Sequence, residues 1–205
     1  SGWCWAKADG SHTSTADPVS TPVPAAAKIT ILSASQTGNA RHTAEKLHTR
    51  LQAQGTAAVL VSAADYKPKN LADEDIVLLI TSTQGEGEPP EEAVSLYKFL
   101  HGKKAPKLDG LRFAVLGLGD SSYARFCGAA VDFDAKLAEL GGTRLLERRD
   151  CDLDFQAAAD AWTDEISTLL QQVSAAASST PAVSVSGSPA VSAYRKNQPF
   201  PATLL

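Results

Sequence analysis

The chain has 205 residues, of which 43% are hydrophobic and 20% charged, values typical of globular proteins and not of disordered or fibrous ones. Its formal net charge of −4 argues against nucleic acid as the main partner, because phosphate groups are bound by a basic face. The longest strongly apolar run covers residues 76–80, whereas a helix needs roughly 20 residues to cross a bilayer. We therefore expect one ordinary domain with tails, or two small ones, and no membrane partner.

Strand and helix patterns alternate between residues 28 and 172. Apolar and β-branched runs predict strands at residues 28–34, 56–63, 76–82, 112–118 and 143–148. Apolar residues at helical spacing predict helices at residues 38–54, 91–101, 126–140 and 155–173. This alternation with short loops indicates an α/β three-layer sandwich, in which helices cover both faces of a five-stranded parallel sheet.

Two stretches of low complexity flank this pattern. Residues 6–27 and 174–193 are rich in Ala, Ser, Thr and Pro and have too little apolar surface to offset the entropy of ordering. We divide the chain into three parts. Residues 1–27 are a flexible segment that ends an oligomerisation or docking region, residues 28–172 are the folded domain, and residues 173–205 are a linker. Because the chain contains no methionine, we expect it to be a fragment or a processed form.

The cysteines show no metal-binding or disulfide pattern. Cys4, Cys127 and Cys151 form no CxxC motif, and no Cys/His cluster has the spacing of metal ligands. We therefore expect reduced thiols, a cytoplasmic location and no metal site.

The loop after the first strand has the features of a phosphate site. Ligands of parallel α/β sheets bind at the carboxyl ends of the strands, and residues 35–40 join the first strand to a helix N-terminus that favours anions. The loop contains neither GxxxxGK[ST] nor GxGxxG, which disfavours Mg-nucleotides and dinucleotides. An ordinary helix start is the alternative.

Two further loops have features suited to a flat ring. Residues 82–90 hold two glycines and two prolines in an irregular turn that a planar ligand edge can approach. Residues 118–127 include Tyr123, whose stacking on a ring is worth about 0.5 to 1.5 kcal/mol beyond its burial. The alternatives are a plain turn, a surface tyrosine, and packing of Phe126 and Cys127 in the next helix. Together the three loops fit a phosphorylated flat ring such as flavin mononucleotide (FMN).

The three loops also resemble those of a known family. SQTGNA, STQGEGEPPEEA and LGDSSYARFC are similar to the flavodoxin-like FMN domain of diflavin reductases. With KKAPKL at residues 103–108, the chain resembles the flavoprotein (alpha) subunit of assimilatory NADPH-sulfite reductase over residues 28–170. The resemblance implies a flavodoxin-like fold with strand order 2-1-3-4-5. It further implies that FMN is bound by Ser35, Gln36, Thr37, Gly38, Asn39, Ala40, Ser82, Thr83, Gln84, Gly85, Leu118, Gly119, Asp120, Ser121, Ser122, Tyr123, Ala124, Arg125, Phe126 and Cys127.

The resemblance also implies a role in electron transport. In that family FMN accepts electrons from an FAD domain that NADPH reduces, and passes them to a hemoprotein subunit that reduces sulfite to sulfide for cysteine biosynthesis. The FAD and NADPH domain is absent from this chain, so we expect an electron carrier without catalytic side chains, taken from an oligomeric oxidoreductase. The alternatives are the FMN domain of another diflavin reductase, a free flavodoxin, and a non-redox docking module.

Acidic residues gather next to the expected flavin edge. We define them as the acidic rim, which consists of Glu86, Glu88, Glu91, Glu92, Asp150, Asp152 and Asp154. Such a rim can steer a basic partner, although a merely solvated acidic face is the alternative. Many relatives of the cytochrome-reductase branch have an aromatic residue where this chain has Gln84, so we expect one face of the ring to be less covered.

Overall fold

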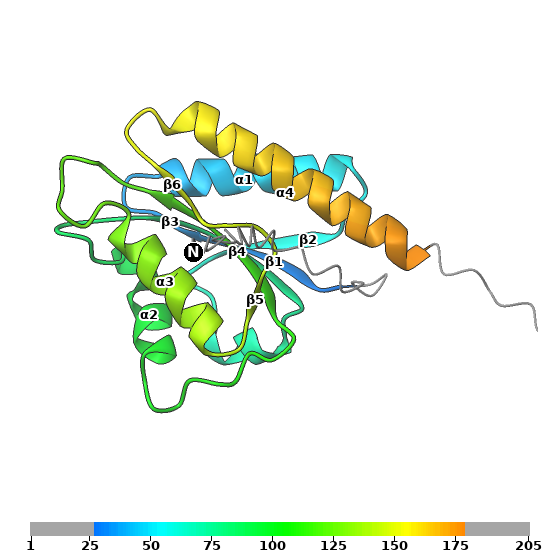
Figure 1. Cartoon of the computed structure of the whole chain (residues 1–205), viewed down its shortest axis with the longest axis horizontal. Helices are drawn as coiled ribbons and strands as arrows, with labels where there is room; N and C mark the ends of the chain where they lie inside the picture. The colour runs from blue at the N-terminus through cyan, green and yellow to red at the C-terminus, as the bar shows by residue number, and fades with distance from the viewer. Residues whose placement is uncertain (1–26, 179–205) are drawn as a thin grey trace, which may run out of the picture.

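The computed structural model describes the backbone of residues 27–178 and the side chains of residues 27–173. Its centre is a parallel sheet with strand order β2-β1-β3-β4-β5, in which β6 also pairs with β4 (Figure 1). The strands are β1 (Ile29–Ala34), β2 (Ala58–Ser62), β3 (Ile76–Ser82), β4 (Arg112–Leu118), β5 (Thr143–Arg144) and β6 (Arg149–Cys151). The predicted parallel sheet and its order 2-1-3-4-5 are confirmed, whereas most of the two predicted tails lies outside the described residues.

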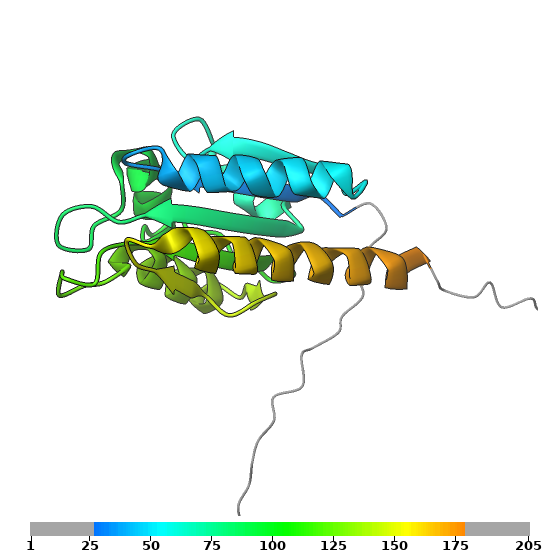
Figure 2. The same cartoon turned by 90° about the horizontal axis from the view of Figure 1, so that it is seen from above.

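Helices cover both faces of the sheet. α1 (Asn39–Ala53) and α4 (Phe155–Ser178) lie side by side on one face, and α2 (Val94–Leu100) and α3 (Gly128–Glu139) lie on the other (Figures 1 and 2). Every residue of β1 and β3 is buried, which explains why these strands show no apolar-polar alternation. Each face therefore has its own hydrophobic core, and Trp162 of α4 is fully buried in the core below α1 and α4.

The fifth predicted strand, residues 143–148, is interrupted. Only its first two residues pair with β4, as β5, and β6 lies just beyond the predicted strand. Four residues separate the paired positions of β5 and β6, whereas only two separate their partners on β4. The extra residues form a bulge that is held from α3, because Arg144 donates to the carboxylate of Asp134 at 2.7 to 3.1 Å and Arg148 lies 3.6 Å from the same group. The bulge brings the end of β6 level with the end of β4, since Cys151 pairs with Leu118.

Helix boundaries differ from the predicted ones at three places. The helix predicted at residues 91–101 begins with a 3-10 turn, Glu91–Ala93, before α2. α3 begins at Gly128 because Cys127 has a left-handed backbone with φ of 50°. α4 continues to Ser178, so the prediction of a linker from residue 173 was wrong for its first residues; the alanines there favour helix. None of the helices within residues 27–178 has the length and apolar character needed to cross a membrane.

Candidate functional site

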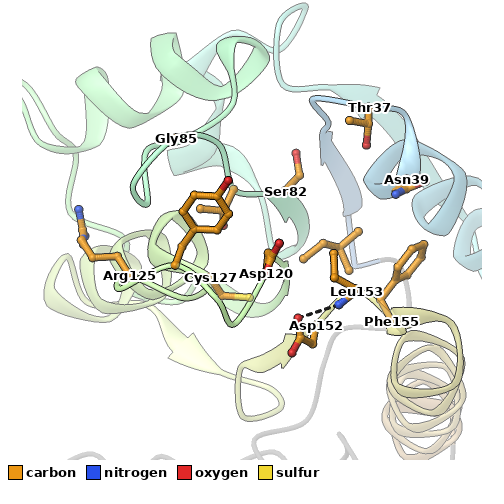
Figure 3. Close-up of a pocket in the computed structure, with 14 residues that line it drawn as sticks. Thr37, Asn39, Ser82, Gly85, Asp120, Arg125, Cys127, Asp152, Leu153 and Phe155 are labelled. Carbon is orange, nitrogen blue, oxygen red and sulfur yellow. Dashed lines mark hydrogen bonds between the residues drawn. The ribbon is translucent and has the colours of Figure 1, made fainter.

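A cavity of about 350 Å³ lies at the carboxyl ends of β1, β3, β4 and β6 (Figure 3). Its lining residues come from the loops that follow these strands: Thr37, Asn39, Ser82, Thr83, Gly85, Leu118, Gly119, Asp120, Tyr123, Arg125, Cys127, Asp152, Leu153 and Phe155. Figure 3 shows Thr37 and Asn39 at one end of the cavity and Gly85 at the other. The cavity is therefore elongated between the start of α1 and the loops after β3 and β4.

The α1 end of the cavity is suited to an anion. The helix begins after Gly38, whose φ of 97° lies in the left-handed region, and no described side chain caps it. Its first turn contains no acidic residue, and the first N–H groups of any helix have no intrahelical acceptor. These groups and the helix dipole favour a phosphate at this end.

The loop that precedes α1 is held by partly buried hydrogen bonds. Ser35 Oγ accepts from the N–H of Gly38 at 2.8 Å, and Ser82 Oγ accepts from the N–H of Gln36 at 2.8 Å. Glu92 accepts from the N–H of Ser35 at 2.8 Å and pairs with Arg41. Glu92 therefore braces the phosphate loop from the 3-10 turn before α2, instead of contributing an unpaired charge to the acidic rim.

Two apolar side chains of the cavity lining are exposed, and we call the space next to them the slot. Tyr123 is 49% exposed and Leu153 is 68% exposed, although both line the cavity. A flat apolar group in the slot would bury apolar surface on both side chains, which favours binding. The Thr83 hydroxyl oxygen, also at the cavity, is buried and has no hydrogen-bond partner among the described residues.

Cys127 lines the cavity, and its thiol is unreactive. Burial, with a smaller contribution from the charge of Asp150, raises the pKa of the Cys127 thiol from 9.0 to about 12. Its side chain is fully buried and its sulfur donates weakly to the carbonyl oxygen of Cys151 at 3.7 Å. A thiol that keeps its proton is a poor nucleophile, so Cys127 contributes shape and not reactivity.

The structure brings together residues from all three predicted loops. Those that line the cavity are Thr37, Asn39, Ser82, Thr83, Gly85, Leu118, Gly119, Asp120, Tyr123, Arg125 and Cys127. The predicted residues that do not line it are Ser35, Gln36, Gly38, Ala40, Gln84, Ser121, Ser122, Ala124 and Phe126. Among the latter, Ala40 is buried in the core below α1, and Phe126 packs against the opposite core.

Sequence reasoning missed the loop after β6. Asp152, Leu153 and Phe155 form a fourth wall of the cavity (Figure 3). Asp152 accepts from the N–H of Ser121 at 3.0 Å and from that of Leu153 at 2.8 Å. The side chain of Ser121, followed by these two N–H groups, lowers the pKa of the Asp152 carboxyl group. The contacts with Ser121 tie this loop to the loop after β4. The sequence does contain an indication that this loop lies near the site, because the fifth predicted strand ends at the same edge of the sheet as its neighbours.

The fold and the site define the class of protein. The chain belongs to the flavodoxin family, which it matches over residues 31–165. It aligns with a solved structure of a cysteine-to-serine mutant of flavodoxin from Pseudomonas aeruginosa with a TM-score of 0.62 and 30% identity, over 70% of this chain and 99% of that one.

Among curated proteins, the chain is similar to a particular group within that class. It is 52% identical, over its whole length, to the sulfite reductase (NADPH) flavoprotein alpha-component of Neisseria meningitidis serogroup A. It is 51% identical, over 89% of its length, to the protein of the same name from Cronobacter sakazakii. The chain spans only 35% and 31% of these two relatives. The predicted resemblance is confirmed.

Membership of the flavodoxin family implies FMN binding, and the residues present fit this group. The uncapped start of α1 suits the phosphate, and the slot, which Tyr123 and Leu153 line, suits an apolar ring. The unpaired hydroxyl of Thr83 suits a ligand that hydrogen bonds in the cavity. Glu92, which contacts the loop before α1, is paired with Arg41, so its negative charge is offset at the α1 end.

Replacing Thr83 by valine is expected to separate folding from binding. A buried polar atom without a partner costs about 1 to 3 kcal/mol, so Thr83→Val should leave the free energy of unfolding of the FMN-free domain unchanged or raise it by about 1 kcal/mol. FMN should bind about fivefold more weakly, because one ligand hydrogen bond is lost. Urea unfolding and quenching of FMN fluorescence measure the two quantities.

The matched control is Thr163→Val, since the buried hydroxyl of Thr163 donates to the carbonyl oxygen of Ala159 at 2.8 Å. That variant should lose stability and keep its FMN affinity. If Thr83→Val instead loses more than about 1 kcal/mol of stability and binds FMN normally, the Thr83 hydroxyl serves the fold and not the ligand.

Proposed function

We propose that this chain relays electrons through bound FMN, from an FAD domain that NADPH reduces to the hemoprotein subunit of an assimilatory sulfite reductase. The observation that carries this proposal is the 52% identity, along the whole chain, to proteins named as sulfite reductase flavoprotein alpha-components. The reaction belongs to sulfur assimilation in the cytoplasm. There the flavoprotein is one subunit of an oligomeric complex.

The side chains of this site bind and orient, while bound FMN supplies the redox chemistry. The start of α1 holds the phosphate, and the loops after β3 and β4, with the loop after β6, hold the ring. Because Tyr123 and Leu153 line the cavity and are exposed, a ring bound next to them would be within reach of a docked partner. Cys127 keeps its proton and takes no part in the transfer.

The acidic rim is the docking surface for the acceptor. Two of its predicted members are neutralised, because Glu92 pairs with Arg41 and Asp150 accepts from Arg148 at 2.9 Å. The members with exposed side chains are Glu86, Glu88, Glu91, Asp152 and Asp154. They follow β3 and β6 and flank the ring end of the cavity, where they attract a basic acceptor.

The deciding experiment is to photoreduce the FMN-loaded chain and to mix it with sulfite reductase hemoprotein. We expect flavin reoxidation with matching reduction of the heme, and a rate that falls at least about fivefold when ionic strength rises from roughly 0.01 to 0.5 M, because salt screens the rim. Glu86→Lys should slow the transfer, whereas Glu139→Lys should not, since Glu139 lies at the far end of α3.

Other outcomes decide between the remaining functions. Reduction of cytochrome c without reduction of the hemoprotein would indicate a diflavin reductase with another acceptor or a free flavodoxin. A chain that fails to take up FMN and stays colourless would indicate a non-redox docking module. A rate of heme reduction that does not depend on salt would exclude steering by the acidic rim.

A further inference from the structure

Arg125 is a cavity residue whose charged group does not face the cavity. Figure 3 shows its side chain directed away from the space between Gly85 and Cys127. Its Nη2 lies 2.9 Å from each carboxylate oxygen of Asp132, one turn into α3. The hydrogen bond to Asp132, and more weakly the charge of Glu88, raise the pKa of the guanidinium, so Arg125 stays charged. The guanidinium of Arg125 therefore interacts with α3 and not with the cavity.

Asp132 is itself fixed from α2. Its Oδ2 accepts from the hydroxyl of Tyr97 at 2.9 Å. The Tyr97 ring stacks on His101 with a centroid distance of 4.1 Å and meets the fully buried Phe133 edge-on at 5.5 Å. These contacts leave Tyr97 little freedom. The chain Arg125–Asp132–Tyr97 thus links the loop before α3 to α2, the helix that follows the turn after β3.

The backbone of that turn lies directly against Arg125. Gln84 and Glu88 close the turn through backbone hydrogen bonds of 2.9 and 3.0 Å. A Cβ atom at Gly87 would lie 2.5 Å from the Cβ of Arg125 and 3.3 Å from its carbonyl oxygen. A Cβ atom at Gly128 would lie 2.7 Å from the carbonyl oxygen of Gly87. The two loops that flank the ring end therefore touch through Gly87, Arg125 and the start of α3.

We propose that Arg125 is a positioning residue, which, through Asp132 and Tyr97, holds the loop after β4 against the turn after β3 and so sets the width of the flavin slot. This inference rests on the proposed FMN role of the cavity. Preformed slots bind more tightly than slots that must be ordered by the ligand. The consequence is that the Arg125–Asp132–Tyr97 chain contributes to FMN affinity without touching FMN through its charged groups.

The test uses Asp132→Asn, which removes the charge partner of Arg125, and Tyr97→Phe, which removes only the hydroxyl that holds Asp132. We expect FMN to bind about fivefold more weakly to Asp132→Asn and about twofold more weakly to Tyr97→Phe. In the FMN-free protein, the Gly87 amide should exchange its hydrogen faster in both variants. Arg125→Lys should recover part of the affinity that Arg125→Met loses.

The matched control is Glu165→Gln, since Arg149 donates to both oxygens of Glu165 at 3.0 Å on α4, outside the cavity lining. This variant should have normal FMN affinity and normal exchange at Gly87. Equal FMN affinity and equal exchange in Asp132→Asn and the control would overturn the proposal. Hydrogen exchange at Gly87 is measured in the FMN-free protein, so it tests the positioning role of Arg125 even if the parent chain binds no FMN. Failure of the proposed cofactor role and failure of the positioning role can therefore be told apart.

Discussion

Replacing Gly119 by valine is expected to weaken FMN binding by up to about a hundredfold. Gly119 lines the cavity, and a Cβ atom there would lie 2.9 Å from both the backbone nitrogen and the sulfur of Cys127. Cys127 is fully buried and cannot yield outward, so relief of the clash moves one of the two residues into the slot. Overpacking costs about 1 to 3 kcal/mol, and each 1.4 kcal/mol is about tenfold in affinity.

Titration of FMN fluorescence against the purified chain measures this effect. Gly119→Ala should show an intermediate loss of about tenfold, because only the first carbon is added. Ala57→Val adds bulk at an exposed position before β2 and should bind FMN normally. An FMN affinity of Gly119→Val within about threefold of the parent chain would mean that the loop after β4 yields away from the cavity, contrary to the packing of Cys127.

The parts of the fold that local sequence determines were predictable. The strands at Ile76–Ser82 and Arg112–Leu118 have the predicted bounds, because strands buried on both faces appear as unbroken apolar runs. Once the strands were known to be parallel, the loops after three of them had to meet at one edge of the sheet. This is why those loops do supply most of the lining of the cavity.

The parts that depend on distant contacts were not predictable. Whether the fifth strand is continuous depends on Arg144 and Arg148, whose partner Asp134 belongs to the preceding helix. The sequence places the residues around Leu153 at this edge of the sheet, but it does not show that Leu153 enters the lining of the cavity. The charge of the acidic rim was also overestimated, because Glu92 is paired with Arg41, which lies 51 residues earlier in the chain.

Raising the pH above about 9 is expected to destabilise the folded domain steeply. In the unfolded chain the Cys127 thiol ionises near its ordinary pKa of 9.0, whereas burial keeps it protonated in the folded state up to about 12. Burial and the neighbouring Glu74, which accepts from the hydroxyl of Tyr66 at 3.1 Å, likewise raise the pKa of Tyr66 above its ordinary 10.0. Between these limits the folded state binds more protons than the unfolded state, so its stability falls as pH rises.

Each such group lowers the free energy of unfolding by about 1.4 kcal/mol per pH unit once its unfolded form has ionised. Urea unfolding from pH 7 to 11 should therefore show a decline that begins near pH 9 with Cys127 and steepens near pH 10 with Tyr66. Cys127→Ala and Cys127→Ser lose different packing contacts, but both remove the thiol. Each should reduce the slope between pH 9 and 10 by the contribution of one proton, whatever its stability at pH 7. Equal slopes in the parent chain and both variants would show that Cys127 titrates in the folded domain as it does in the unfolded chain. Its thiol would then be accessible to water in the folded domain.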